Sequence, residues 1–193
     1  MRERSQQIKR WARWLATFVG FPAAGVAARL CVGDVDDVPA AIIGGLAGGA
    51  VLGTVQAFVG GVEAKDRLRW ILATAGALSL GLAVGGRFVD FATDATSLAV
   101  MGAVCGVAVG VAQAFSIPMT TRDRLAWALA TPVLWTVGWL VTAQVIVDAD
   151  RHHATFGSSG AILVSALSGI LVVLRASDVG QLTGRTSRMA GAS

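Results

Sequence analysis

Six long apolar segments, nearly free of charged residues, limit the folds that are open to this chain. An α-helix needs about 20 residues to cross ~30 Å of hydrocarbon, and each segment has roughly that length. Backbone groups surrounded by lipid must bond within their own segment, which favours helices. We therefore predict an all-α polytopic membrane protein, a single transmembrane domain over residues 1–193. The six predicted transmembrane helices cover approximately residues 11–30, 38–59, 68–88, 97–117, 125–147 and 157–175.

The overall composition agrees with this prediction. Of the 193 residues, 54% are hydrophobic and only 15% are charged, whereas about a quarter of the residues of a soluble domain are charged. A soluble domain of this length exposes a large share of its surface to water and could not hide so much apolar area. Lipid is therefore the expected solvent.

The first apolar segment allows two interpretations. It can span the membrane if Arg13 and Arg29 extend their charged ends to the two interfaces. Alternatively, the basic start, the apolar stretch and the small residues at 24–28 would form a cleaved signal peptide. The internal repeat described below includes this segment, which favours the spanning helix.

The charged residues are distributed unevenly between the two sides of the predicted helices. With the N-terminus inside, thirteen Lys and Arg residues fall on the inner side and three on the outer side, whose loops are rich in Asp. Four tryptophans also fall at the inner interface: Trp11, Trp14, Trp70 and Trp127. This bias predicts a multi-pass protein with both termini in the cytoplasm. The chain has fourteen Arg against two Lys, which indicates a GC-rich codon bias and hence a bacterial source. We therefore expect the protein in a bacterial inner membrane. Because topology accounts for the net charge of +4, we expect the lipid bilayer as partner and no nucleic acid.

The chain contains an internal repeat. The triplet Leu-Ala-Thr occurs at 15–17, 72–74 and 129–131, and Gln-Ala-Phe occurs at 56–58 and 113–115, so the period is 57. Each period holds two predicted spans, so successive units enter the membrane in the same sense. We predict three parallel helical hairpins, at about 10–66, 67–123 and 124–180, around a pseudo-threefold axis normal to the membrane.

Small residues form stripes on the second helix of each hairpin. Residues at i, i+4 and i+8 share one helix face, and small side chains allow two helices to approach closely in lipid. We expect these glycine-zipper stripes to contact one another or their hairpin partners. The three stripes are Gly45, Gly49 and Gly53; Gly102, Gly106 and Gly110; and Ala161, Ser165 and Gly169, the last set shifted by two residues. Gly44 and Gly48 widen the first stripe.

Polar residues within the predicted spans are few. Gln56 and Gln113 occupy equivalent positions, and two interpretations remain open: a polar constriction facing the axis, or an interhelical hydrogen bond. Thr17, Thr74 and Thr131 recur in all three units and are expected to bond back to a carbonyl one turn earlier.

Other residues of the spans carry smaller expectations. We predict kinks at Pro22 and Pro132. Trp135 and Trp139 would line a groove or pack. We expect Cys31 and Cys105 to be small buried apolar residues at different depths, with no disulfide.

One outer loop combines carboxylates and imidazoles, the ligands that suit Zn²⁺. The spacing matches no metal-binding motif, so the cluster is a weak candidate and we predict no metal. Its members are Asp148, Asp150, His152 and His153. Arg29, Arg87 and Arg151 accompany acidic residues in the outer loops and are expected to form local ion pairs.

A longer pattern joins the Gln-aromatic motif to the basic loop that follows it. It runs from Gly110 to Phe115, continues through Arg122 and Arg124, and ends in Trp127-Ala128-Leu129-Ala130-Thr131. This pattern is similar to small multispanning membrane proteins of bacteria that repeat a Gln-aromatic-basic motif. The resemblance implies a multispanning fold and carries no activity.

No Asp, Glu, Lys or His lies deep in a predicted span, which argues against a proton-coupled pump, a haem site or intramembrane catalysis. We therefore predict no catalytic residues and no cofactor. The first functional hypothesis is a non-enzymatic interaction or accessory membrane protein, either a homo-oligomer or bound to a partner membrane protein. The alternative is a small transporter or channel with a path along the pseudo-threefold axis.

Overall fold

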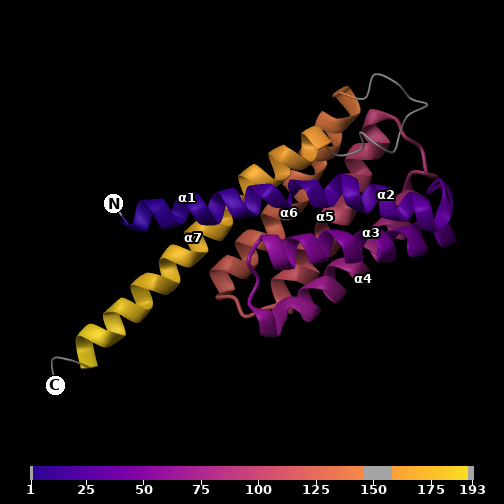
Figure 1. Ribbon diagram of the computed structural model, residues 1–193. Helices are drawn as coiled ribbons and strands as arrows, with labels where there is room; N and C mark the ends of the chain where they lie inside the picture. Colours follow the sequence, from indigo (N-terminus) through magenta and orange to yellow (C-terminus); the bar gives the residue numbers. More distant parts are fainter. Residues whose placement is uncertain (1, 146–157, 191–193) are drawn as a thin grey trace.

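The computed structural model describes residues 2–145 and 158–190, and side chains over 4–144 and 159–175. The described chain is almost entirely helical and contains no strand (Figure 1). Its elements are α1 (Arg2–Leu15), the 3₁₀ helix η1 (Ala16–Val19), α2 (Gly20–Val32), α3 (Val38–Val59), the 3₁₀ helix η2 (Ala64–Asp66), α4 (Arg67–Phe88), α5 (Ala95–Ser116), α6 (Thr121–Val145) and α7 (Ser158–Ala190).

Five of the helical segments are long and apolar enough to cross a membrane. They are Arg4–Val32, Val38–Val59, Ala64–Phe88, Ala95–Ser116 and Thr121–Gln144. A sixth, shorter apolar stretch, Ser159–Arg175, belongs to α7. Large apolar side chains also cover the outside of the bundle, where Leu72 and Leu129 are more than 60% exposed. Such a surface is stable in lipid and costly in water, so the chain has the properties of a membrane protein.

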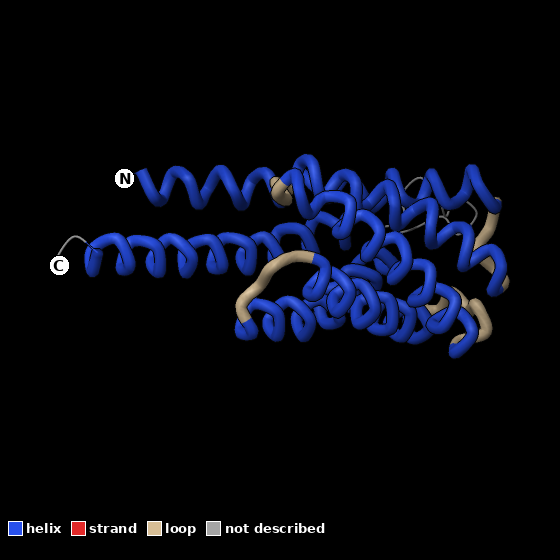
Figure 2. Tube along the Cα trace, turned by 90° about the horizontal axis from the view of Figure 1, so that it is seen from below, coloured by secondary structure: helices blue, strands red, loops and turns tan. Residues whose placement is uncertain are grey.

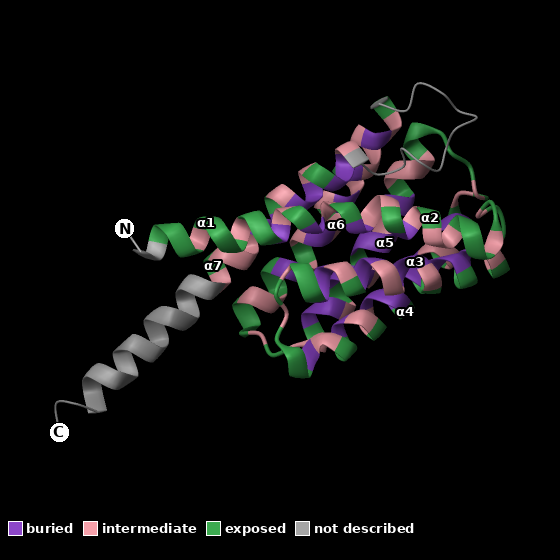
Figure 3. Cartoon of the chain, viewed as in Figure 1, coloured by how far each residue is buried: buried purple, intermediate pink, exposed green. Residues whose placement is uncertain are grey.

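The helices pack in chain order and close into a bundle. Each helix from α2 to α6 contacts the next one, and α7 contacts α1. The start of α1, the far end of α7 and the loops at 60–66 and 117–120 lie at one end of the bundle, which we call the basic end (Figures 1 and 2). The loops at 33–37 and 89–94 lie at the opposite, acidic end. Figure 3 shows that buried positions face the middle of the bundle and exposed positions face outward.

Two aspartates of the acidic end begin the helices that follow them. The Asp37 carboxylate accepts a hydrogen bond from the Ala40 backbone N–H at 2.7 Å. Asp94, at the matching position one sequence period later, accepts from the backbone N–H groups of Thr96 and Ser97 at 3.0 and 3.1 Å. These are N-caps, which satisfy donors that the first turn of a helix leaves free. Sequence reasoning treated these residues only as part of the outer acidic charge.

Glycine stripes bring α3 against α4 and α5 against α6. A Cβ on Gly45 would lie 2.5 Å from Ser79 Cα, and one on Gly106 would lie 2.5 Å from Pro132 Cα. No real Cβ atom fits so close to backbone, so these approaches require glycine. These two stripes were expected to contact one another or the first helix of their own hairpin. Instead, the stripe on α3 contacts α4 and the stripe on α5 contacts α6, in each case the next helix along the chain. The reason is that α4 and α6 offer backbone or small side chains at the facing positions.

The other small residues of the bundle have different partners. Gly48 does meet the hairpin partner, because its Cβ would lie 2.9 Å from the Ala24 carbonyl oxygen of α2. In the third stripe, a Cβ on Gly169 would lie 3.0 Å from Cδ1 of Trp11 on α1. Small residues therefore line both sides of α3 and also the contact that closes the bundle between α7 and α1.

A short 3₁₀ segment interrupts the first helix ahead of Pro22. Proline has no N–H to bond the carbonyl four residues earlier, and that carbonyl belongs to Phe18 in η1. The predicted disturbance at Pro22 therefore takes the form of a tightened turn. At Pro132, α6 continues as one helix, and the kink there stays a prediction.

Both cysteines are free, but only one is buried. Cys105 is fully buried in the core, as predicted, whereas Cys31 is exposed. The burial expected for Cys31 was wrong because α2 ends at the bundle surface. The predicted ion pairs form at Arg29 with Asp34 (2.6 Å) and Arg87 with Asp90 (3.8 Å). Arg151 lies outside the described residues.

Candidate functional site

Three tryptophans meet in the middle of the bundle near its basic end. Trp14, Trp70 and Trp127 come from α1, α4 and α6, and all three are buried. Their ring centroids lie 5.5 to 6.2 Å apart, each pair in an edge-to-face arrangement. Aromatic pairs favour this geometry because the positive ring edge meets the negative face. We call this group the tryptophan triad, and it fills the centre of the bundle at this level.

Helix geometry explains how Trp14 joins the triad although it is out of register. Trp70 and Trp127 are one period apart, and one period before Trp70 stands Arg13. The hydroxyls of Thr74 and Thr131 donate to the carbonyls of Trp70 and Trp127, four residues back, whereas Thr17 donates to Trp14, three residues back. Three residues of 3₁₀ helix rise about 6 Å, the same as four residues of α-helix. The 3₁₀ turn therefore compensates for the shift, and the predicted back-bonds of all three threonines are confirmed.

Each indole N–H of the triad donates a hydrogen bond to a side chain on a neighbouring helix. Trp70 donates to the Oε1 of Gln56 on α3 at 3.2 Å, and Trp127 to the Oε1 of Gln113 on α5 at 3.2 Å. Trp14 donates to the Oγ of Ser168 on α7 at 2.8 Å. A buried indole N–H needs such a partner, so these bonds fix the orientation of all three rings.

The two glutamines also bond to each other. The Nε2 of Gln113 donates to the Oε1 of Gln56 and to the Oγ1 of Thr74, both at 2.9 Å. The interpretation of these residues as an interhelical hydrogen bond is thus confirmed. Their network joins α3, α4, α5 and α6 beside the triad, and no ionisable group takes part in these bonds.

Sequence reasoning missed Ser168. The sequence period leads from Gln113 to Ile170, which is apolar and about half exposed. The third stripe is shifted by two residues relative to the other two, and the same shift applied to Ile170 leads to Val172. Ser168 lies one helical turn before Val172, on the same helix face. A search for a hydroxyl within one turn of the shifted position would have found it.

A small polar cavity lies next to the triad. It offers about 20 Å³ to the centre of a water molecule, enough for one water. Trp14, Trp127 and the two glutamines border it, and hydroxyl-bearing residues complete its polar lining: Thr131, Ser165 and Ser168. Gln56 and Gln113 therefore line a small polar cavity and also bond across the helices, while the constriction facing the axis stays a prediction.

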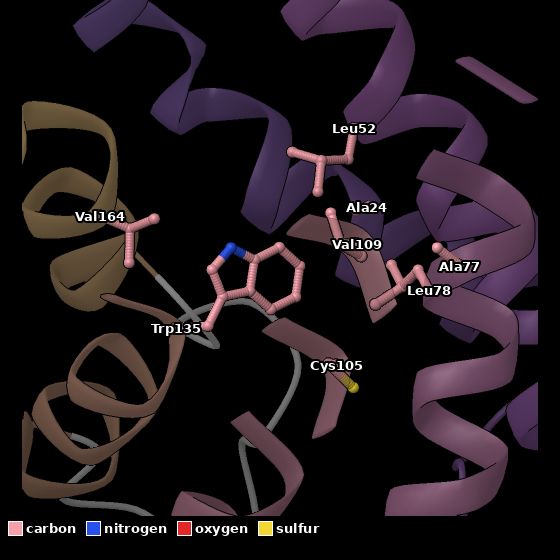
Figure 4. Packing of buried hydrophobic residues seen from close by; sticks show 8 residues of the cluster. All are labelled: Ala24, Leu52, Ala77, Leu78, Cys105, Val109, Trp135 and Val164. Atoms are coloured by element: carbon pink, nitrogen blue, oxygen red, sulfur yellow. The ribbon is translucent and has the colours of Figure 1, made fainter. Parts of the chain in front are cut away.

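A larger cavity opens from the acidic end. It has a volume of about 370 Å³, and Phe21, Trp135 and Val164 separate it from the small polar cavity, since they line both. Figure 4 shows Trp135 at this level, with Leu52, Val109 and Val164 around it. The rings of Trp135 and Phe21 pack against each other, with their centroids 5.6 Å apart. Trp139 also lines this acidic-end cavity. Trp135 lines it too and at the same time packs in the hydrophobic core.

A third cavity, of about 520 Å³, opens from the basic end and reaches the other side of the triad. Trp14 and Trp127 line both this cavity and the small polar one. The walls of this basic-end cavity carry five basic and three acidic residues: Arg10, Arg13, Lys65, Arg122 and Arg175, with Glu63, Asp66 and Asp123. Among the described side chains, Asp123 Oδ2 is the one buried oxygen or nitrogen without a hydrogen-bond partner.

The three cavities therefore lie in series through the bundle. Shared lining residues join each to the next: Phe21, Trp135 and Val164 on the acidic side, and Trp14 and Trp127 on the basic side. Aromatic rings stand at both junctions. The acidic-end cavity is mainly apolar, whereas charged side chains line the basic-end cavity.

The predicted metal candidates Asp148, Asp150, His152 and His153 lie outside the described residues. Within the described part of the chain, no group of three His, Cys, Asp or Glu side chains is placed to hold a metal ion. No protein-family model, curated protein or solved structure matches the chain. The class that the fold defines is an all-helical membrane protein.

Proposed function

We propose that this protein is a transporter or channel for a small solute, whose path follows the series of three cavities and whose closed state is the one described here. The single observation that carries the proposal is the pair of cavities that open from opposite ends and stop at the tryptophan triad. These two cavities approach a polar chamber one water wide from opposite sides.

We further propose six spans, with Ser159–Arg175 of α7 as the sixth, built as three hairpins around a pseudo-threefold axis normal to the membrane. The three indole-to-side-chain bonds and the three threonine back-bonds support this symmetry. The basic end would face the cytoplasm of a bacterial cell, so both termini would lie inside, in keeping with the positive-inside rule.

The rival hypothesis of an accessory or oligomeric interaction protein rested on the glycine stripes, on the lack of ionisable groups at membrane depth and on the short loops. Of these grounds, the stripes support it less, because Gly45, Gly49 and Gly106 pack against α4 and α6 of the same chain. The apolar side chains that remain on the outside are spread around the bundle, as contact with lipid requires. The geometry therefore favours transport, and neither hypothesis involves catalysis.

Solute flux into proteoliposomes tests the proposal. We would follow osmotic swelling by light scattering for a panel of small neutral and charged solutes. The Gln113→Leu variant removes the polar amide from the constriction and should abolish selective flux, whereas Trp127→Ala opens the triad and should increase flux. Trp11→Ala is a matched control, because Trp11 donates to the Ala166 carbonyl outside the triad and its loss should leave selectivity unchanged. Equal, solute-independent leakage for all four proteins would contradict the proposal.

A further inference from the structure

The acidic-end cavity combines aromatic walls with an acidic mouth. Its deep walls are apolar and include Phe21, Trp135 and Trp139. Its volume of about 370 Å³ falls within the usual range of small-molecule sites, which are mostly apolar with a few polar groups. The charged residues that line it belong to the end of α2 and the loop that follows: Arg29, Asp34 and Asp36.

Among the described residues, the mouth keeps one negative charge without an ion-pair partner. Arg29 and Asp34 form an ion pair at 2.6 Å, so their charges largely cancel. Asp36 has no ion pair with any described residue and gives the lining a formal charge of −1 (one Arg against two Asp). The described acidic-end loops add to this field, because they and the adjoining helix ends carry five Asp against Arg29 and Arg87, a sum of −3. A cleft with low-dielectric walls concentrates such a field at its mouth.

The walls favour one kind of cation over others. The face of an indole or phenyl ring attracts a cation, most strongly where water is excluded. An inorganic cation would need several oxygen ligands to replace its water, and no described group of carboxylates, thiols or imidazoles meets that need. An organic cation with an apolar body and no N–H donors loses little hydration free energy on leaving water. It also gains contact with the aromatic rings.

We propose that the acidic-end cavity binds organic cations of the quaternary ammonium class, with the charged group between Asp36 and the Trp139 ring and the apolar body against Trp135. The proposal deepens the proposed function, on which it rests for the route by which the cation would cross. Binding itself needs only the cavity.

Binding would be measured with the full chain in lipid nanodiscs by equilibrium dialysis. The probes are benzyltrimethylammonium, neutral benzyl alcohol and anionic benzenesulfonate, which have similar apolar bodies. We expect saturable binding of the cation, at least tenfold weaker binding of the other two, and loss of affinity as salt is added. Equal binding of the cation and the alcohol would overturn the proposal.

Two pairs of variants locate the site. Asp36→Asn should weaken cation binding roughly threefold to tenfold, whereas Asp90→Asn removes the same charge from a residue outside the cavity lining and should change affinity much less. Trp139→Leu should weaken binding roughly threefold to thirtyfold, and Trp139→Phe less. Asp36 is exposed, so its variant should keep the fold, as a thermal unfolding curve would verify. Unchanged affinity in both Asp36→Asn and Trp139→Leu would overturn the proposal.

The two proposals fail in different ways. Saturable binding of benzyltrimethylammonium without flux of any solute would leave the site and overturn the transport function. Selective flux of another solute, with no binding of the cation, would leave the transport function and overturn this inference.

Discussion

The side-chain amide nitrogen of Gln113 donates a hydrogen bond to the side-chain oxygen of Gln56 at 2.9 Å, although the two residues are 57 positions apart. Both side chains are at least 94% buried, and each also accepts an indole N–H of the triad. This bond joins the second helix of one predicted hairpin to the second helix of the next. It stabilises the bundle and makes the small cavity beside the triad polar.

The first prediction concerns this bond. Gln113→Leu leaves the indole N–H of Trp127 without its acceptor and should lower the free energy of unfolding by about 1–3 kcal/mol. The double variant Gln56→Leu/Gln113→Leu should lower the free energy of unfolding by less than the sum of the two single variants. The reason is that either single variant already removes the hydrogen bond between the two side chains. Reversible denaturation in mixed micelles would measure the coupling. Additive losses would show that the two amides act independently.

The second prediction uses two glycines in similar helical settings. Gly106→Ala places a Cβ about 2.5 Å from Pro132 Cα, so α5 and α6 must separate, and we expect a loss of about 1–3 kcal/mol. Gly76→Ala meets nothing within 4 Å and should stabilise α4 by up to about 1 kcal/mol. Gly106→Leu should be more harmful still. Thermal unfolding in detergent gives the order, and equal effects at both positions would mean that the α5–α6 contact is loose.

The third prediction follows from the 3₁₀ turn. An alanine inserted between Leu15 and Ala16 places Trp14 four residues before the threonine, as Trp70 stands before Thr74. Because four α-helical residues rise about as far as three 3₁₀ residues, the segment should become α-helical with a stability change within about 1 kcal/mol.

The control for the insertion is the same alanine placed between Ala50 and Val51 of α3. It rotates the rest of α3 by about 100° and takes Gly53 and Gln56 out of their contacts, so it should prevent stable folding. Tryptophan fluorescence and thermal unfolding would compare the two insertions. If both are equally harmful, the 3₁₀ turn does not act as the proposed adjustment.

The fourth prediction concerns acid. The pKa of Asp94 lies below its usual value because the Ser97 hydroxyl, followed by the Ser97 backbone N–H, donates to the charged carboxylate. A carboxyl whose pKa is lowered on folding contributes stability above its unfolded pKa of about 3.9, and this contribution is lost as the pH falls through the folded value. Asp94→Asn retains a good N-cap without a titrating group. The gap in melting temperature between wild type and variant should therefore change below about pH 4. Parallel curves from pH 6 downward would contradict this role.

Much of the fold follows from the sequence because hydrophobic length and helical period are local properties. The predicted segment 38–59 coincides with α3, and the other predicted helices differ from the structure mainly at their ends. Caps and loop ends depend on single hydrogen bonds, such as that from Ala40 to Asp37, which a hydropathy pattern does not contain. The same pattern could not tell that Cys31 stands at a surface.

The candidate site was only partly predictable. The period of 57 identified Gln56 and Gln113 as equivalent, and it identified Thr74 and Thr131 beside them. It could not supply Ser168 or Trp14, because each is displaced from the period and reaches the site through helix geometry. The cavities themselves depend on the distances between helices, which glycine contacts such as that of Gly106 with Pro132 determine.

The sequence by itself determined that this chain forms apolar helices of membrane-spanning length, since backbone in lipid must satisfy its own hydrogen bonds. It also determined which residues recur at equivalent positions. Only the tertiary structure decided which helices touch, because a stripe of small residues fits any close neighbour and the choice depends on the shape of the facing helix. That choice brought three indoles together at the centre of the bundle and left cavities on both sides of them.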